Sequence, residues 1–266
     1  MIPKINIENK LKKYLELGVP PTTFIGSILP VYYEFKNISC CFYDEIILPN
    51  LEEHAFEIRM KLTLYVYSDF NISVDHILIP ENDETQTLLF YFKDQSKRNE
   101  IADLQSYVFS LSKKKIDIYN DSLFIKKLGK ILEYPNCCIE NCIELRKKKG
   151  GSLEANTRDK LYKIENLETE IENINSYFAY EFYPCDPYCK NANKIGNHIL
   201  SGCKQIDSKL YLATKLYFQY NIIRILDANS TKEELLKVQE NYNVSIYQSI
   251  CKKENLFTKL KNKLKL

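Results

Sequence analysis

Residues 72–93 read ISVDHILIPENDETQTLLFYFK, and this stretch predicts a β-hairpin. Two apolar-rich runs, residues 72–79 and 87–93, flank a polar segment at 80–84 that suits a hairpin loop of about four to five residues. Upstream, residues 59–67 alternate apolar and polar side chains, and residues 42–48 do so in part. Because antiparallel strands with one buried face show this alternation, we expect all of these segments to be strands.

The remainder of the chain has the three- and four-residue spacing of apolar side chains that is typical of helices. The segments predicted to be helical are residues 4–17, 97–111, 121–132, 136–148, 154–181, 187–200 and 204–227. Ser230 and Glu233 predict a capping box at the start of one more helix, and the lysine-rich end from Cys251 predicts a basic amphipathic helix. The fold class is therefore predicted as α+β. An N-terminal antiparallel sheet with flanking helices (residues 1–118) would precede a mainly helical part that carries the cysteine motifs (residues 119–266).

The composition is that of a folded globular protein, with 45% apolar and 27% charged residues in a chain of 266. The formal net charge of +2 provides no overall attraction to nucleic acid or to an anionic membrane. The N-terminal residues lack the apolar core of a secretory signal, and no segment approaches the roughly 18 to 20 apolar residues that span a bilayer. We therefore expect a cytoplasmic protein without a membrane partner.

Nine cysteines in a chain without an export signal predict free, metal-bound or catalytic thiols rather than disulfides. Five of them lie in two short proline-containing segments, residues 133–142 (EYPNCCIENC) and residues 182–189 (FYPCDPYC). Proline suits the first turn of a helix, and Asn136 and Asp186 are good N-cap residues, so both segments predict helix starts. The positive end of a helix favours the thiolate, which is the form that binds metals.

The predicted metal ligands are Cys137, Cys138, Cys185 and Cys189, with Cys142 in reserve because it shares a helix face with Cys138. Zinc sites need four ligands, whereas adjacent cysteines on a helix diverge by roughly 100° and seldom bind one small ion. An iron–sulfur cluster is larger and accepts a wider geometry. Zinc and an iron–sulfur cluster therefore both remain open as the cofactor, with a dithiol redox pair and inert packing as alternatives.

The remaining cysteines carry weaker signals. Cys40, Cys41 and Cys251 are expected to pack as small apolar side chains, and the role of Cys203 is undecided.

Among the three histidines, His198 lies roughly two to three turns beyond Cys189 and could approach the same site. Neither a phosphate-binding glycine loop nor an H-E-x-x-H motif occurs, so the sequence identifies no reaction.

The two cysteine segments resemble an archaeal family of uncharacterised proteins, domain of unknown function 483. The family pattern G-x-x-L-x-Y-P-x-C-C matches residues 129–138, and a later P-C-x-x-x-C matches residues 184–189, while Tyr183 stands where the pattern leads us to expect histidine. The resemblance covers roughly residues 120–200. It implies an archaeal origin, and it implies that Cys137, Cys138, Cys185 and Cys189 form the family's site. It implies no particular reaction.

Basic residues suggest RNA as an alternative partner. Arg146, Lys147, Lys148 and Lys149 end the helix that begins with the cysteine pair, and lysines recur in the tail at residues 259–265. Tyrosine and lysine together can bind RNA by base stacking and phosphate contact. The alternative function is therefore an RNA- or protein-interaction module in which zinc, or plain packing of the cysteines, holds the helices together.

Overall fold

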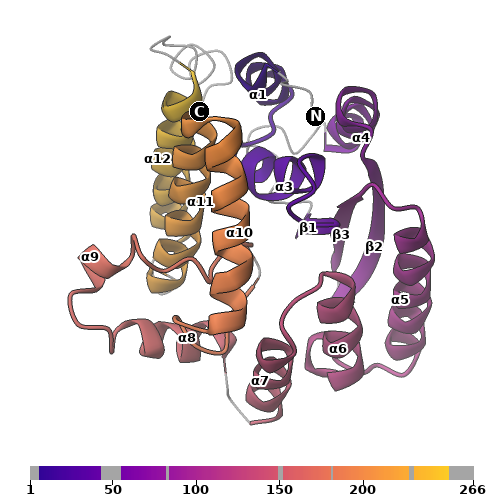
Figure 1. The fold of residues 1–266 in the computed structure, drawn as a ribbon. Coiled ribbons are helices and arrows are strands. Elements are labelled where there is room, and N and C mark those ends of the chain that lie inside the picture. Colours follow the sequence, from indigo (N-terminus) through magenta and orange to yellow (C-terminus); the bar gives the residue numbers. More distant parts are fainter. Residues whose placement is uncertain are drawn as a thin grey trace.

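The computed structural model of the chain describes residues 6–42, 55–81, 84–148, 152–180, 182–227 and 231–251. The predicted mixed α+β class is confirmed (Figure 1). In chain order the elements are α1 (Ile7–Glu16), α2 (Pro21–Thr23), a short π-helix (Phe24–Ile28), α3 (Leu29–Tyr32), β1 (Ile38–Phe42), α4 (Ala55–Phe70), β2 (Ser73–Glu81), β3 (Glu84–Phe92), α5 (Ser96–Lys113), a 3₁₀ turn (Ile118–Asn120), α6 (Ser122–Ile131), α7 (Asn136–Lys147), α8 (Leu153–Leu161), α9 (Leu167–Glu170), α10 (Lys190–Ile206), α11 (Ser208–Leu226) and α12 (Lys232–Ile250).

The three strands form one antiparallel sheet in the order β1-β3-β2. The predicted hairpin is confirmed as β2 and β3, and its strands reach further into the loop than expected, because Glu81 still pairs with Glu84. The strand predicted at residues 42–48 lies outside the described residues except for Phe42, which is the last residue of β1.

The central strand β3 is buried on both faces, which explains its continuous apolar sequence LLFYF. Leu88, Phe90 and Phe92 point to one side, where α5 and α6 cover the sheet and complete one hydrophobic cluster. Leu89 and Tyr91 point to the other side and join a larger cluster formed with the N-terminal helices, α4 and the C-terminal helices. The sheet is therefore the middle layer between helices on both faces.

The strand predicted at residues 59–67 is wrong, because these residues belong to helix α4. The side chains of Leu62, Val66 and Phe70 are 1%, 0% and 3% exposed and are spaced four residues apart, as one helix face requires. Met60 and Leu64, which would have shared the buried strand face with Leu62, are 48% and 62% exposed. The apparent alternation arose because the helical face and the expected strand face have two residues in common.

Two ion pairs also connect helix α4 to α1. The carboxylate of Asp69 lies 2.8 Å from the Lys10 ammonium and 2.7 Å from the Lys13 ammonium. Burial of Asp69 opposes its ionisation, but hydrogen bonds and attraction from the two lysines outweigh this and lower the pKa of Asp69 below its ordinary value.

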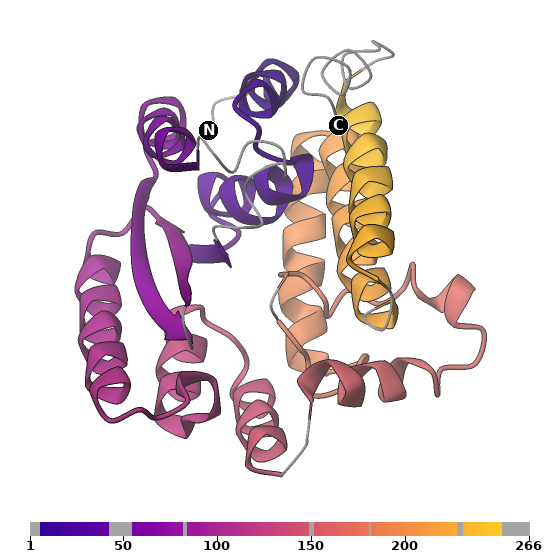
Figure 2. The ribbon, with the colours of Figure 1, turned by 180° about the vertical axis from the view of Figure 1, so that it is seen from behind.

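Helices α10, α11 and α12 lie side by side as a bundle, with α8 across one end (Figures 1 and 2). The capping box at the start of α12 is formed by Thr231 and Glu234, one residue later than predicted; Ser230 lies outside the described residues. The lysine-rich end beyond Cys251 also lies outside them. Within the described ranges, no helix combines the length and apolar character needed to cross a membrane.

The long helix predicted at residues 154–181 is wrong. The structure has the shorter helices α8 and α9, separated by Asn166 in the left-handed region at φ 56°, and an irregular segment follows. Leu161, Ile174 and Tyr177 from this stretch pack with residues of α11 in a third hydrophobic cluster. Ile164, Leu167 and Ile171 are only partly buried and pack against this cluster, so the predicted stripe is covered in part, and by a folded-back chain rather than by one helix. The boundary predicted between residues 118 and 119 stays a prediction, and the cluster under α5 and α6 continues across it.

Candidate metal centre

The start of helix α7 positions the adjacent cysteines. Pro135 is the N-cap residue, and Asn136, which was predicted to be the cap, is the first helical residue. The carbonyl oxygen of Pro135 accepts hydrogen bonds from the backbone N–H groups of Cys138 and Ile139, so the first turn is closed. Cys137 and Cys138 therefore lie at the N-terminal end of the helix, as predicted, where the helix dipole favours negative charge.

The second cysteine segment is a turn rather than a helix start at Asp186. The Asp186 carboxylate accepts from the backbone N–H of Tyr188, and its carbonyl accepts from that of Cys189. Helix α10 begins only at Lys190, with Cys189 as its N-cap residue, so the predicted N-cap role of Asp186 is wrong. The turn is fixed by the buried hydroxyl of Ser176, which donates to the Pro187 carbonyl at 2.6 Å.

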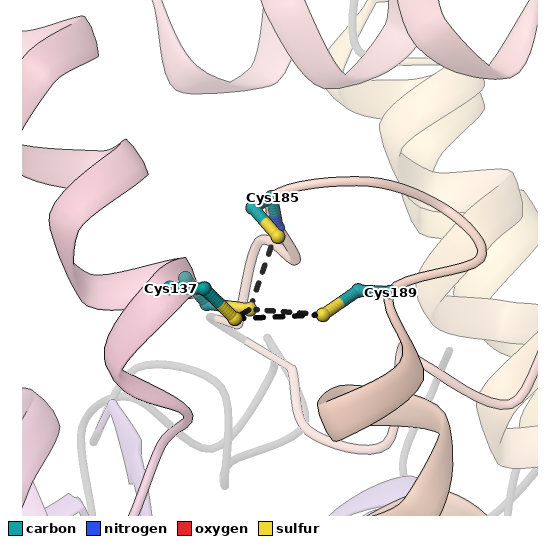
Figure 3. Close-up of side chains that lie close together, drawn as sticks. Cys137, Cys185 and Cys189 are labelled. Carbon is teal, nitrogen blue, oxygen red and sulfur yellow. Dashed lines mark hydrogen bonds between the residues drawn. The ribbon is translucent and has the colours of Figure 1, made fainter.

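The sulfur atoms of Cys137, Cys138, Cys185 and Cys189 come together and lie within 4.8 Å of one another. The Cys189 sulfur is 3.7 Å from that of Cys137 and 3.7 Å from that of Cys138. Figure 3 shows the side chains converging from the start of α7, from the loop at Cys185 and from the start of α10. The structure therefore places all four predicted ligands in one group that could hold a metal ion.

Both adjacent cysteines take part in this group, contrary to the expectation that they would diverge. Their sulfurs are 3.9 Å apart. Both cysteines lie in the first turn of α7, and the loop at Cys185 and the start of α10 approach that turn, so the two sulfurs face the same group (Figure 3).

Hydrogen-bond donors surround the sulfurs. The backbone N–H of Cys185 donates to the Cys138 sulfur at 3.4 Å, and the side-chain amide of Asn191 donates to the Cys137 sulfur at 3.6 Å. The Lys160 ammonium donates to the Cys185 carbonyl at 2.7 Å and brings a positive charge to the loop. Such groups orient metal ligands and stabilise thiolates. Sequence reasoning missed Asn191 and Lys160; Asn191 follows the motif by two positions, whereas nothing local marks Lys160.

The thiols differ in acidity. Burial opposes ionisation of Cys137, but hydrogen bonds from Asn191 and the neighbouring cysteines outweigh it and lower the pKa of Cys137. Burial raises the pKa of Cys138 far above the usual thiol range and raises the pKa of Cys185 to about 12. Four sulfurs packed this closely repel one another when ionised, and a divalent cation among them reverses that repulsion.

Cys142, the reserve ligand, is not a member of the four-sulfur group. It lies four residues beyond Cys138 on α7 and lines a neighbouring cavity. Burial raises the pKa of Cys142, and the charge of Arg146 lowers it only in part. His198 lies edge-on to the Phe35 ring and is also outside the group.

The other cysteines are distributed elsewhere. Cys41, Cys203 and Cys251 are buried in the largest hydrophobic cluster, and Cys40 is packed against the cluster under α5 and α6.

The residues of the basic run at 146–149 differ in exposure to solvent. Lys147 and Lys148 are exposed at the end of α7, whereas the Nε atom of Arg146 is buried. Lys149 and the lysine-rich tail lie outside the described residues. Contact with RNA therefore stays a prediction.

Gly129 in the first motif has a packing role. A Cβ atom at this position would lie 2.7 Å from Cγ1 of Ile139, so glycine allows α6 and α7 to approach closely. The motif therefore contains both the glycine that allows α6 and α7 to pack closely and the cysteine pair at the start of α7.

Comparison with known proteins gives one similarity, to a family model that covers part of the chain. Residues 100–216 match the family model described as a protein of unknown function (DUF483). No curated protein and no solved structure matches the chain. The matched region runs from α5 into α11 and includes all four clustered cysteines, so the resemblance to this family is confirmed over residues 100–216.

Proposed function

We propose that Cys137, Cys138, Cys185 and Cys189 bind a single zinc ion that holds helix α7 against the start of helix α10. The observation that carries the proposal is the sulfur spacing. Four thiolates placed tetrahedrally at about 2.3 Å around one zinc ion lie about 3.8 Å apart. The sulfurs of Cys137, Cys138 and Cys189 are 3.7, 3.7 and 3.9 Å apart, and the Cys185 sulfur lies within 4.8 Å of each of them.

The same spacing argues against a four-iron cluster. Such a cluster occupies the space between its ligands, so its cysteine sulfurs are held further apart than those around a single ion. The four sulfurs here lie within 4.8 Å of one another, so the segments would have to separate to admit it. A mononuclear ion fits without that movement, and among mononuclear ions zinc is the usual partner of four thiolates.

The site supports a structural role more than a catalytic one. Catalytic zinc keeps one coordination position open for water or substrate, whereas four cysteines fill a tetrahedral shell. Cys138 and Cys189 are 2% and 8% exposed and belong to the largest hydrophobic cluster, so an ion at this point would fasten two distant chain segments inside the core. A reducing cytoplasm, where thiols stay reduced, suits such a site.

The test is metal analysis of the full chain purified under anaerobic conditions, together with its optical spectrum before and after replacement by Co²⁺. The proposal expects about one zinc per chain, no colour, and after replacement the intense thiolate-to-cobalt absorption of a tetrahedral four-sulfur site. Iron and inorganic sulfide in comparable amounts, with broad visible absorption, would establish a cluster instead.

A dithiol redox function gives a different result in the same preparation. If the protein contained no metal, and mild oxidation reversibly joined Cys137 or Cys138 to Cys185 or Cys189, the zinc proposal would be refuted. Peptide mapping of the oxidised chain identifies the linked residues.

A further inference from the structure

Next to the four-cysteine group the structure contains an apolar cavity of about 160 Å³. It is bounded by the sheet, α6, α7 and the segment that precedes Cys185. Its walls are mainly aliphatic and aromatic, including Leu88, Phe124, Leu128, Ile139 and Phe182. An apolar cavity of about 150 Å³ is large enough for a benzene ring. This space therefore suits one ring or a short aliphatic chain.

One face of α7 forms the polar part of the wall. Cys138, Cys142 and Arg146 follow one another at four-residue steps and all line the cavity. Arg146 is the only charged residue among the described residues of the lining. Its guanidinium Nε is buried and has no hydrogen-bond partner among the residues that the structure describes.

This arginine lacks an internal counter-charge in the described part of the chain. No described carboxylate forms an ion pair with it, and none lines the cavity. Arg146 as a whole is partly exposed, but its buried Nε–H donor is costly without a partner, since it has lost water and gained no hydrogen bond in return. A guanidinium also presents its donors in a planar fork that matches a carboxylate.

We propose that this cavity binds a small carboxylate with an aromatic or short aliphatic body, which places its apolar part between α6 and α7 and its anionic end against Arg146. Cavity size limits the body to about six carbon atoms, the size of a benzene ring. The proposal does not depend on a metal in the neighbouring site, although Cys138 contributes to both.

Benzoate is the probe, and its neutral isostere benzamide is the comparison ligand. Both would be titrated into the full chain and followed by calorimetry and by methyl NMR. We expect benzoate to bind at least about tenfold more tightly than benzamide, because a charge-assisted bidentate hydrogen bond contributes more than a neutral one. The methyl signals of Ile125, Leu128 and Ile139 should shift, and those of Ile250, which lies elsewhere in the fold, should not.

The matched variants are Arg146→Met and Lys147→Met, which remove the same charge from neighbouring positions of α7. Lys147 is exposed and does not line the cavity. Arg146→Met should weaken benzoate binding about tenfold and leave benzamide binding within about twofold, while Lys147→Met should change neither.

Equal affinities for benzoate and benzamide, or equal effects of the two variants, would overturn the proposal. If Arg146→Met failed to fold, the NMR titration of the wild-type chain with benzoate would decide alone. The proposal is refuted if the methyl signals of the cavity residues do not shift. Zinc content measured in the same samples separates this result from the metal proposal, because benzoate binding and metal retention can fail independently.

Discussion

Replacing Cys189 by serine is the most direct perturbation of the four-cysteine group. Its sulfur lies 3.7 Å from two of the other three sulfurs, and its side chain is only 8% exposed, so serine leaves a gap in the shell that solvent enters poorly. Zinc binding to four-ligand peptides is worth about 10–16 kcal/mol, or roughly 3 kcal/mol for each ligand if shared equally. A loss of about 3 kcal/mol weakens zinc affinity about 100-fold.

The same loss should appear as reduced folding stability. A ligand that binds only the folded state stabilises it in proportion to the logarithm of its affinity, so a 100-fold weaker site removes about 2.7 kcal/mol at saturating zinc. For a chain of this length, that corresponds to a fall in Tm of about 5–10 °C. Cys142→Ser is the matched control, because Cys142 is on the same helix and outside the group.

The assay combines zinc analysis after gel filtration with thermal unfolding in the presence and absence of a chelator. Wild type and Cys142→Ser should retain zinc and lose stability when the chelator is added. Cys189→Ser should lose its zinc at a chelator concentration about 100-fold lower than wild type, and in zinc-saturated buffer it should melt about 5–10 °C lower. The reasoning is refuted if Cys189→Ser keeps its zinc and its Tm, or if Cys142→Ser loses as much of both.

Three further predictions concern the fold. Leu62→Ala should destabilise the protein by about 2–4 kcal/mol and Leu64→Ala by less than about 0.5 kcal/mol in urea unfolding, because only the first side chain is buried on α4; similar losses would contradict the helix. Asp69→Asn should cost about 1–2 kcal/mol at neutral pH by loss of its two lysine partners. Since the folded-state pKa of Asp69 is lowered, this difference between variant and wild type should be complete above pH 4 and vanish as the pH falls through that lowered pKa; a difference that persists in acid would contradict it. Gly196→Ala would place a Cβ atom 1.8 Å from the Asn175 carbonyl oxygen, so we expect a loss of about 3 kcal/mol or more in urea unfolding, and an unchanged midpoint would show that the two segments do not meet.

The chemistry of the site was predictable because its signals are local. Cysteine and proline in the segments at 133–142 and 182–189 identify the ligands and a helix start directly from residue type. The meeting of the two segments was not a local property. It depends on the turn at Asp186, which Ser176 holds, and on a chain that folds back between α8 and α10.

Side-chain geometry corrected one expectation about the site. Adjacency of Cys137 and Cys138 predicted divergence, yet their sulfurs are only 3.9 Å apart. The single ion proposed above rests on the distances among the sulfurs. Lys160 and Asn191 reach the site only through tertiary structure.

The sequence by itself determined the hairpin, most of the helices and which four cysteines belong to the site, since these follow from periodicity and residue chemistry over a few positions. Only the tertiary structure decided that residues 59–67 are helical and that residues 154–181 do not form one helix. The physical reason is the same in both cases. An apolar pattern indicates which side chains can be buried, but the neighbouring segments of the folded chain decide which of them are buried and in which backbone conformation, as the exposed Met60 and Leu64 show.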